Sequence, residues 1–166
     1  MGVVQSLQKS GLDELVHVVE KTGLVEVIGD WSEHVDELGL FLRKLAENKH
    51  VHVVVYGSSK FVDLLSFYNK LEPYLSMLEN VAVIWENSVE ALIYHILLLG
   101  KGRGSALVIV FPHDKHLNSQ IENTYLYKLR SALMEARKRG WVVIVVNPVR
   151  RMPNGAHNKL AKLTLY

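Results

Sequence analysis

The sequence contains no cysteine and only four prolines among its 166 residues. The missing thiols exclude a disulfide framework, a thiolate nucleophile and thiolate metal ligands. An excess of one charge is also absent, because 19 Lys and Arg residues against 17 Asp and Glu residues leave a net charge of +2. The hydrophobic content of 49% is too high for an intrinsically disordered chain. These absences leave a globular domain as the expected class.

Long hydrophobic runs are missing as well. No apolar run reaches the roughly 18 residues of a membrane helix, and residues 1–15 lack the basic and apolar regions of a signal peptide. We therefore expect a cytoplasmic protein without membrane contact. Because the chain has no linker, repeat or low-complexity tract, we expect one domain over residues 1–166.

What the sequence does contain is a series of short apolar runs rich in β-branched residues, most of them bounded by Gly, Pro or Asn. These runs, which we expect to be strands, span residues 25–29, 51–56, 81–85, 106–111, 141–146 and 163–166. Since they are continuously apolar and do not alternate, both faces of the sheet should be covered, as in a parallel sheet.

Amphipathic periodicity predicts helices between these strands. The expected helices span residues 33–48, 59–78, 88–99 and 118–139, and we expect Pro73 to break the second of them. Strands that alternate with helices predict a three-layer α/β domain with a mainly parallel central sheet.

In such a fold, ligands bind at the carboxyl ends of the strands. The first expected strand ends at Gly29, where a phosphate-binding loop would follow with glycines, a lysine and a Ser or Thr. The residues that follow are acidic instead: Asp30, Glu33, Asp36 and Glu37. Carboxylates repel a nucleotide and suit a helix N-terminus. We therefore predict an acidic helix start here.

Seven segments carry a family resemblance by their order and spacing. They are Ser10–Leu15 (SGLDEL), Thr22–Gly29 (TGLVEVIG), Val54–Phe61 (VVYGSSKF), Leu78–Val81 (LENV), Leu107–Val110 (LVIV), Val142–Arg151 (VVIVVNPVRR) and Gly155–Leu163 (GAHNKLAKL). Together they resemble the RecA-fold recombinase core, in particular archaeal RadA and its short paralogs. The resemblance implies a RecA-like domain of the P-loop NTPase type. It begins near residue 10, so we expect no counterpart of the family's N-terminal helical domain.

The functional positions of the resembled family carry other residues in this chain. The Walker A lysine falls at Val35, the adjacent Ser or Thr at Asp36, and the glutamate that polarises the attacking water at Ser58. The Walker B aspartate falls at Phe111, and the glutamine that senses the nucleotide state falls at Pro148. Phosphoryl transfer depends on those groups for positioning and charge neutralisation. The resemblance therefore implies a pseudo-ATPase without catalytic residues or cofactor.

Basic residues near the end of the chain are candidates for DNA binding. Arg150 and Arg151 follow the fifth expected strand, where the resembled family has a loop that runs along single-stranded DNA, and Lys159 lies further on. Guanidinium groups there would neutralise phosphates and stack on bases, although a solvated turn explains the same residues equally well. For residues 137–139 (RKR) we expect a simpler role, the complement of a helix C-terminus.

A weaker candidate site lies just after the fourth expected strand. His113, Asp114 and His116 offer two imidazoles and a carboxylate, which suit Zn²⁺. Their spacing in a loop is nonspecific, so we expect no tightly bound metal. His52 is expected to be a packing or surface group, and His95 has no partner evident in the sequence.

The leading hypothesis is a non-catalytic RadA or RecA paralog that assists homologous recombination and DNA repair. Its partners would be a RecA-family recombinase or another paralog, and single-stranded DNA. The alternative hypothesis is a small-ligand or metal-binding α/β protein or enzyme that uses the strand-end pocket near His113 and His116.

Overall fold

The computed structural model describes residues 3–6, 12–28, 35–56, 64–76, 78–111 and 123–147. Strands and helices alternate along this part of the chain. The strands are β1 (Val3–Ser6), β2 (Leu24–Ile28), β3 (His50–Tyr56), β4 (Val81–Glu86), β5 (Ser105–Val110) and β6 (Val142–Asn147). The helices are α1 (Leu12–Thr22), α2 (Val35–Leu45), α3 (Leu64–Leu75), α4 (Val89–Leu97) and α6 (Asn123–Lys138).

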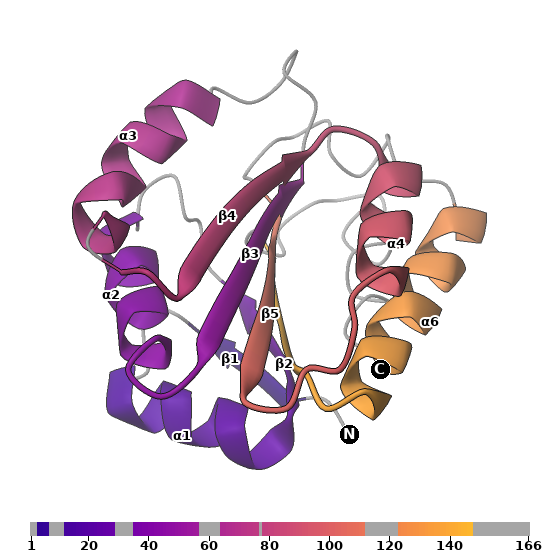
Figure 1. The fold of residues 1–166 in the computed structure, drawn as a ribbon, viewed down its shortest axis with the longest axis horizontal. Coiled ribbons are helices and arrows are strands. Elements are labelled where there is room, and N and C mark those ends of the chain that lie inside the picture. The colour runs from indigo at the N-terminus through magenta and orange to yellow at the C-terminus, as the bar shows by residue number, and fades with distance from the viewer. Residues whose placement is uncertain are drawn as a thin grey trace.

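The six described strands form one sheet in the order β1-β2-β6-β5-β3-β4. Every neighbouring pair is parallel, which confirms the expected parallel sheet. The pairing brings together segments that are far apart in the sequence; Val27, for example, is in register with Val146. All carboxyl ends of the strands therefore lie at one edge of the sheet (Figure 1).

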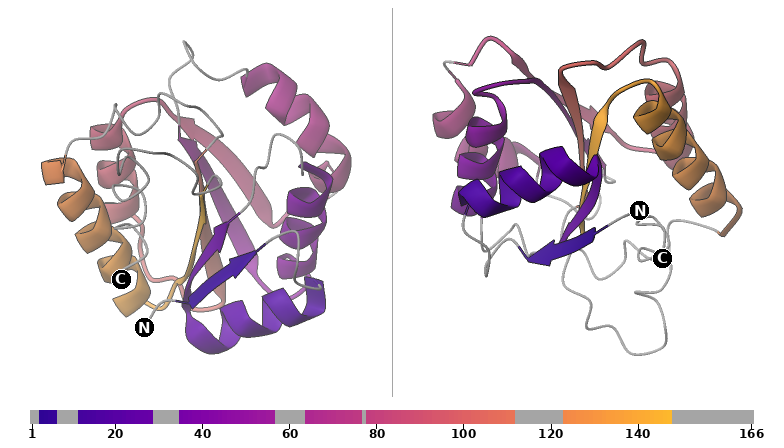
Figure 2. Two further views of the ribbon diagram at one scale, coloured as in Figure 1. Left: turned by 180° about the vertical axis from the view of Figure 1, so that it is seen from behind. Right: turned by 90° about the horizontal axis from the view of Figure 1, so that it is seen from below.

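Helices cover both faces of the sheet (Figures 1 and 2). Helices α1, α2 and α3 lie on one face, and α4 and α6 lie on the other. The side chains of β3 illustrate this, because Val53 and Val55 join the core beneath α1–α3, whereas Val54 and Tyr56 join the core beneath α4 and α6. The three-layer α/β class is thus confirmed, and it is consistent with a RecA-like arrangement. Among the described helices, none is long and apolar enough to cross a membrane.

Most expected elements are confirmed with shifted ends. The helix predicted over residues 33–48 is observed as α2. Its first turn contains Asp36 and Glu37, as expected from the predicted acidic helix start. Strand β1 and helix α1 are observed but were not predicted. The expected strand over residues 163–166 lies outside the described residues.

The prediction that Pro73 breaks its helix is wrong. Helix α3 runs from Leu64 to Leu75 and contains Pro73. Proline cannot donate a hydrogen bond to the carbonyl four residues earlier, which belongs to Asn69. Both residues are exposed, so water can reach that carbonyl, and only the last turn of the helix is affected.

Candidate functional site

Two positions that correspond to catalytic groups of the resembled family are part of the hydrophobic core. Val35 begins α2 and is buried in the core beneath α1–α3. Phe111 follows β5, is completely buried, and packs its ring against Tyr56 with the ring centroids 5.6 Å apart. Hydrocarbon side chains in these places offer neither a cation for phosphates nor a ligand for Mg²⁺.

Asp36 links two helices. The hydroxyl of Tyr74 on α3 donates a hydrogen bond of 2.6 Å to Oδ1 of Asp36 in the first turn of α2. This bond is the main reason why the pKa of Tyr74 is raised above its ordinary value, with smaller contributions from desolvation and from the nearby carboxylates. The carboxylate thus has a structural partner and a favourable place at a helix N-terminus.

The other predicted site residues lie outside the described part of the chain. They are Gly29, Ser58, His113, Asp114, His116, Pro148, Arg150, Arg151 and Lys159. The hypotheses about them therefore stay predictions.

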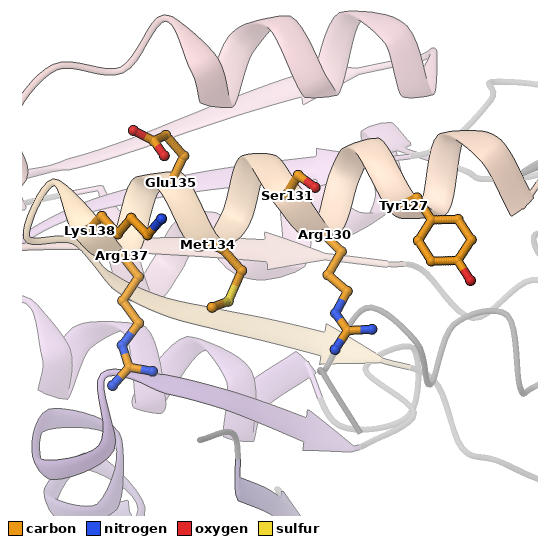
Figure 3. Close-up of a pocket in the computed structure, with 7 residues that line it drawn as sticks. All are labelled: Tyr127, Arg130, Ser131, Met134, Glu135, Arg137 and Lys138. Atoms are coloured by element: carbon orange, nitrogen blue, oxygen red, sulfur yellow. The ribbon is translucent and has the colours of Figure 1, made fainter.

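An open pocket of about 640 Å³ lies beside α6. Among the described residues, those that line it all belong to this helix, at the helical spacing of three, four and seven residues. The lining residues are Tyr127, Arg130, Ser131, Met134, Glu135, Arg137 and Lys138. Figure 3 shows that Arg130, Met134 and Arg137 project from the same side of α6. We call Tyr127, Arg130, Met134, Arg137 and Lys138 the α6 stripe.

The α6 stripe combines positive charge with an exposed aromatic ring. Three cations line the pocket against the single carboxylate of Glu135. Tyr127 is 64% exposed, which leaves the face of its ring accessible to a ligand. An anionic ligand with flat, apolar groups is the chemistry that such a surface fits.

The last turn of α6 also holds other elements in place. Nη2 of Arg137 donates a hydrogen bond of 3.0 Å to the carbonyl of Thr22 at the end of α1. Nη1 of Arg139 donates to the carbonyls of Leu97 and Leu99 at 2.8 and 2.7 Å, at the end of α4. Basic residues do lie in the last turn of α6, as expected, and two of these arginines also bind the C-terminal carbonyls of neighbouring helices.

A second polar cluster lies between α4 and the strands at the edge of the sheet. Nε2 of His52 on β3 lies 2.6 Å from Nε2 of His95 on α4, and Nδ1 of His95 lies 3.0 Å from Oε1 of Glu86 on β4. Burial, followed by the effect of His95, lowers the pKa of His52 below its ordinary value of 6.5. In the described residues, no group of three or more His, Cys, Asp or Glu side chains converges in a way that could hold a metal ion.

Neither the pocket beside α6 nor the histidine contact was predicted. The helical spacing of Tyr127, Arg130, Met134 and Lys138 is a signal for the pocket, but the sequence pattern placed the expected ligand site at the strand ends. No sequence signal joins His52 to His95, because 43 residues separate them and only the packing of α4 on the sheet brings β3 and α4 together.

No model of a known protein family matches the sequence, and no curated protein matches it either.

Proposed function

We propose that the protein is a non-catalytic RecA-like protein that binds single-stranded DNA and assists a recombinase, or another paralog, in homologous recombination and DNA repair. The RecA-like assignment rests on the ordered sequence motifs and on an α/β fold that is consistent with them. The observation that carries the DNA-binding part is the α6 stripe.

The absence of catalysis is supported by the side chains that stand at the catalytic positions. Val35 is 5% exposed and Phe111 is 0% exposed, so each contributes to the core and neither can approach a phosphate. Because phosphoryl transfer is almost entirely positioning and electrostatic stabilisation, a chain with these residues lacks the means for it. DNA binding in this protein then proceeds without ATP turnover.

Single-stranded DNA suits the α6 stripe by charge and by shape. Arg130 and Lys138 are eight residues apart, which places them about 12 Å apart along the helix axis. That length spans more than one nucleotide, and the exposed ring of Tyr127 offers a stacking surface for an unpaired base. Cations that contact phosphates, together with an aromatic ring, predict binding that depends on salt and tolerates any base sequence.

The test is fluorescence anisotropy with a labelled single-stranded oligonucleotide at several salt concentrations. The variant R130Q/K138Q removes two cations from the α6 stripe and leaves Arg137, which binds the end of α1, in place. The matched control R43Q/K70Q removes two exposed cations from α2 and α3, on the opposite face of the sheet.

The full-length parent should bind with micromolar affinity. R130Q/K138Q should bind more weakly and reduce the slope of log affinity against log salt by about 1.4, at about 0.7 for each lost phosphate contact. The control should behave like the parent. If both double variants lower affinity equally, the effect is one of net charge and the α6 stripe is not the DNA site.

The segment that contains Arg150 and Arg151 provides a second arm of the same experiment. If R150A/R151A abolishes binding while R130Q/K138Q binds like the parent, DNA runs along that segment and the role of the α6 stripe is contradicted. If the parent binds no DNA at all, the proposed function fails.

A further inference from the structure

Helix α4 is apolar on its outer side as well as on its inner side. The inner side is buried in the core by four aliphatic residues, which are Val89, Leu92, Ile93 and Ile96. The outer side exposes Tyr94, Leu97 and the C-cap residue Leu98, whose exposed fractions are 68%, 41% and 81%. Because positions three and four residues apart are neighbours on a helix surface, these three side chains form one patch, which we call the α4 patch.

The α4 patch is left open by the described part of the chain. Helix α6 lies beside α4 on the same face of the sheet (Figures 1 and 2), where the hydroxyl of Tyr125 donates a hydrogen bond of 2.7 Å to Oε1 of Glu90. Tyr94 and Leu98 nevertheless stay more than half exposed. A helix that is apolar all round is normally a buried one, and contiguous exposed apolar side chains mark interaction sites.

The two ends of the α4 patch carry opposite charges. Glu90 is exposed in the first turn of α4, four residues before Tyr94. Lys101 and Arg103 are exposed just after the other end. The second ionisable residue of α4, His95, contacts His52 and Glu86 on the inner side and adds no charge to the patch. The surface is therefore acidic at one end, apolar in the middle and basic at the other end.

We propose that the α4 patch is the interface of a homodimer, in which α4 of a second copy of this chain packs antiparallel against it. In a two-fold dimer the same surface of both copies meets, so that surface must be complementary to itself. The antiparallel arrangement meets this condition, because the acidic end of each copy lies beside the basic end of the other. A parallel pair would bring like charges together. The interface uses no residue of the α6 stripe, so it is independent of the proposed DNA binding.

The apolar and the charged contacts require the same two-fold axis. An axis at the level of Ile96 places Tyr94, two residues before it, against Leu98 of the second copy, two residues after it. The same axis places Glu90, six residues before Ile96, beside residues 101–103 of the second copy. Because three large side chains and two charged ends make a small interface, we expect association in the micromolar range.

The experiment is sedimentation velocity of the full chain over a series of concentrations. L98K removes an apolar side chain from the α4 patch and suits the end of a helix, where a cation is favourable. Y94K is a second patch variant. The matched control L40K places the same charge on Leu40, which is 40% exposed on α2, on the opposite face of the sheet. Circular dichroism identifies any variant that fails to fold.

Charge variants test the antiparallel arrangement. E90K makes both ends of the patch basic, and K101E/R103E makes both ends acidic, so each variant alone should repel its own copy. An equimolar mixture of the two should associate, because every end then meets an opposite charge. Mixing cannot repair a folding defect, so recovery in the mixture reports on the interface itself.

We expect a parent dimer with a micromolar dissociation constant. L98K and Y94K should each raise this constant about tenfold or more, as for central residues of an interface, and L40K should leave it unchanged. E90K and K101E/R103E should each weaken association, and their mixture should regain the affinity of the parent. A parent that stays monomeric up to about 100 μM, an L40K variant that associates as weakly as L98K, or charge variants that do not associate when mixed would each contradict the proposed dimer.

Discussion

Single side chains decide what the carboxyl edge of the sheet can do. Phe111 and Tyr56 close the ends of β5 and β3 with packed aromatic rings, and Val35 begins α2 inside the core. A carboxylate or an ammonium group in these places would have to be buried without a partner, at a cost of several kcal/mol. The apolar side chains at these positions therefore stabilise the chain.

His52 should make stability depend on pH. Burial and the neighbouring His95 lower its pKa in the folded protein below 6.5. The unfolded chain then binds the proton more readily, so the stabilisation is complete above pH 6.5 and is lost as the pH falls below that value. H52Q removes this titration. Urea unfolding across the acidic range should give a shallower fall in unfolding free energy for H52Q than for the parent, and equal slopes would contradict the burial of a neutral His52.

At the scale of elements, helix α4 is held at its start by a local contact and at its end by a distant one. Ser88 caps α4 through a hydrogen bond of 3.1 Å, in which Oγ of Ser88 accepts from the backbone N–H of Ala91. Serine is among the residues preferred at the N-cap of a helix. The other end of α4 depends on Arg139, a contact between distant parts of the chain. Arg137 in the last turn of α6 and Arg139 just after the helix thus hold the ends of α1 and α4.

The contact between α2 and α3 depends on Gly39. A Cβ atom at this position would come 2.5 Å from Cδ2 and 2.6 Å from Cγ of Tyr74. G39A should therefore cost about 1–3 kcal/mol through overpacking, partly offset by about 1 kcal/mol of helix propensity. Chemical denaturation should show a net loss of about 1 kcal/mol in unfolding free energy.

The control for this substitution is G100A, because an added Cβ at Gly100 meets nothing within 4 Å. G100A should leave the unfolding free energy within about 0.5 kcal/mol of the parent. A G39A variant as stable as G100A would show that Tyr74 moves aside without cost.

At the scale of the whole molecule, the layers could be predicted from the sequence but the neighbours in the sheet could not. Continuous apolar runs such as residues 106–111 indicated strands buried on both faces, and β5 is one. The pairing of β2 with β6 joins residues such as Val25 and Ile144, and no local pattern encodes that distance. Strand β1 was missed because four residues are too few for a periodic signal.

The candidate sites follow the same division. The acidic start of α2 and the buried Val35 and Phe111 agree with local sequence patterns. The pocket beside α6 and the His52–His95 contact depend on how the elements pack, which the sequence does not display. Local sequence patterns therefore predicted the start of α2, whereas the pocket and the histidine contact depend on the packing of α6 and α4.

The most direct test of a RecA-like protein that binds DNA without ATP turnover is a single anisotropy titration, carried out with and without ATP and Mg²⁺. ATP can change the affinity for DNA only if it binds the protein with different affinities in its DNA-free and DNA-bound states. Val35 and Phe111 are buried hydrocarbon side chains, and Asp36 is hydrogen-bonded to Tyr74, so none of them offers ATP a binding group. We predict that the single-stranded oligonucleotide binds with micromolar affinity and with the same dissociation constant in both conditions. We also predict that ATP itself binds no more tightly than about 100 μM, equivalent to roughly −5.5 kcal/mol. A DNA affinity that changes severalfold when ATP and Mg²⁺ are added would contradict the proposed function.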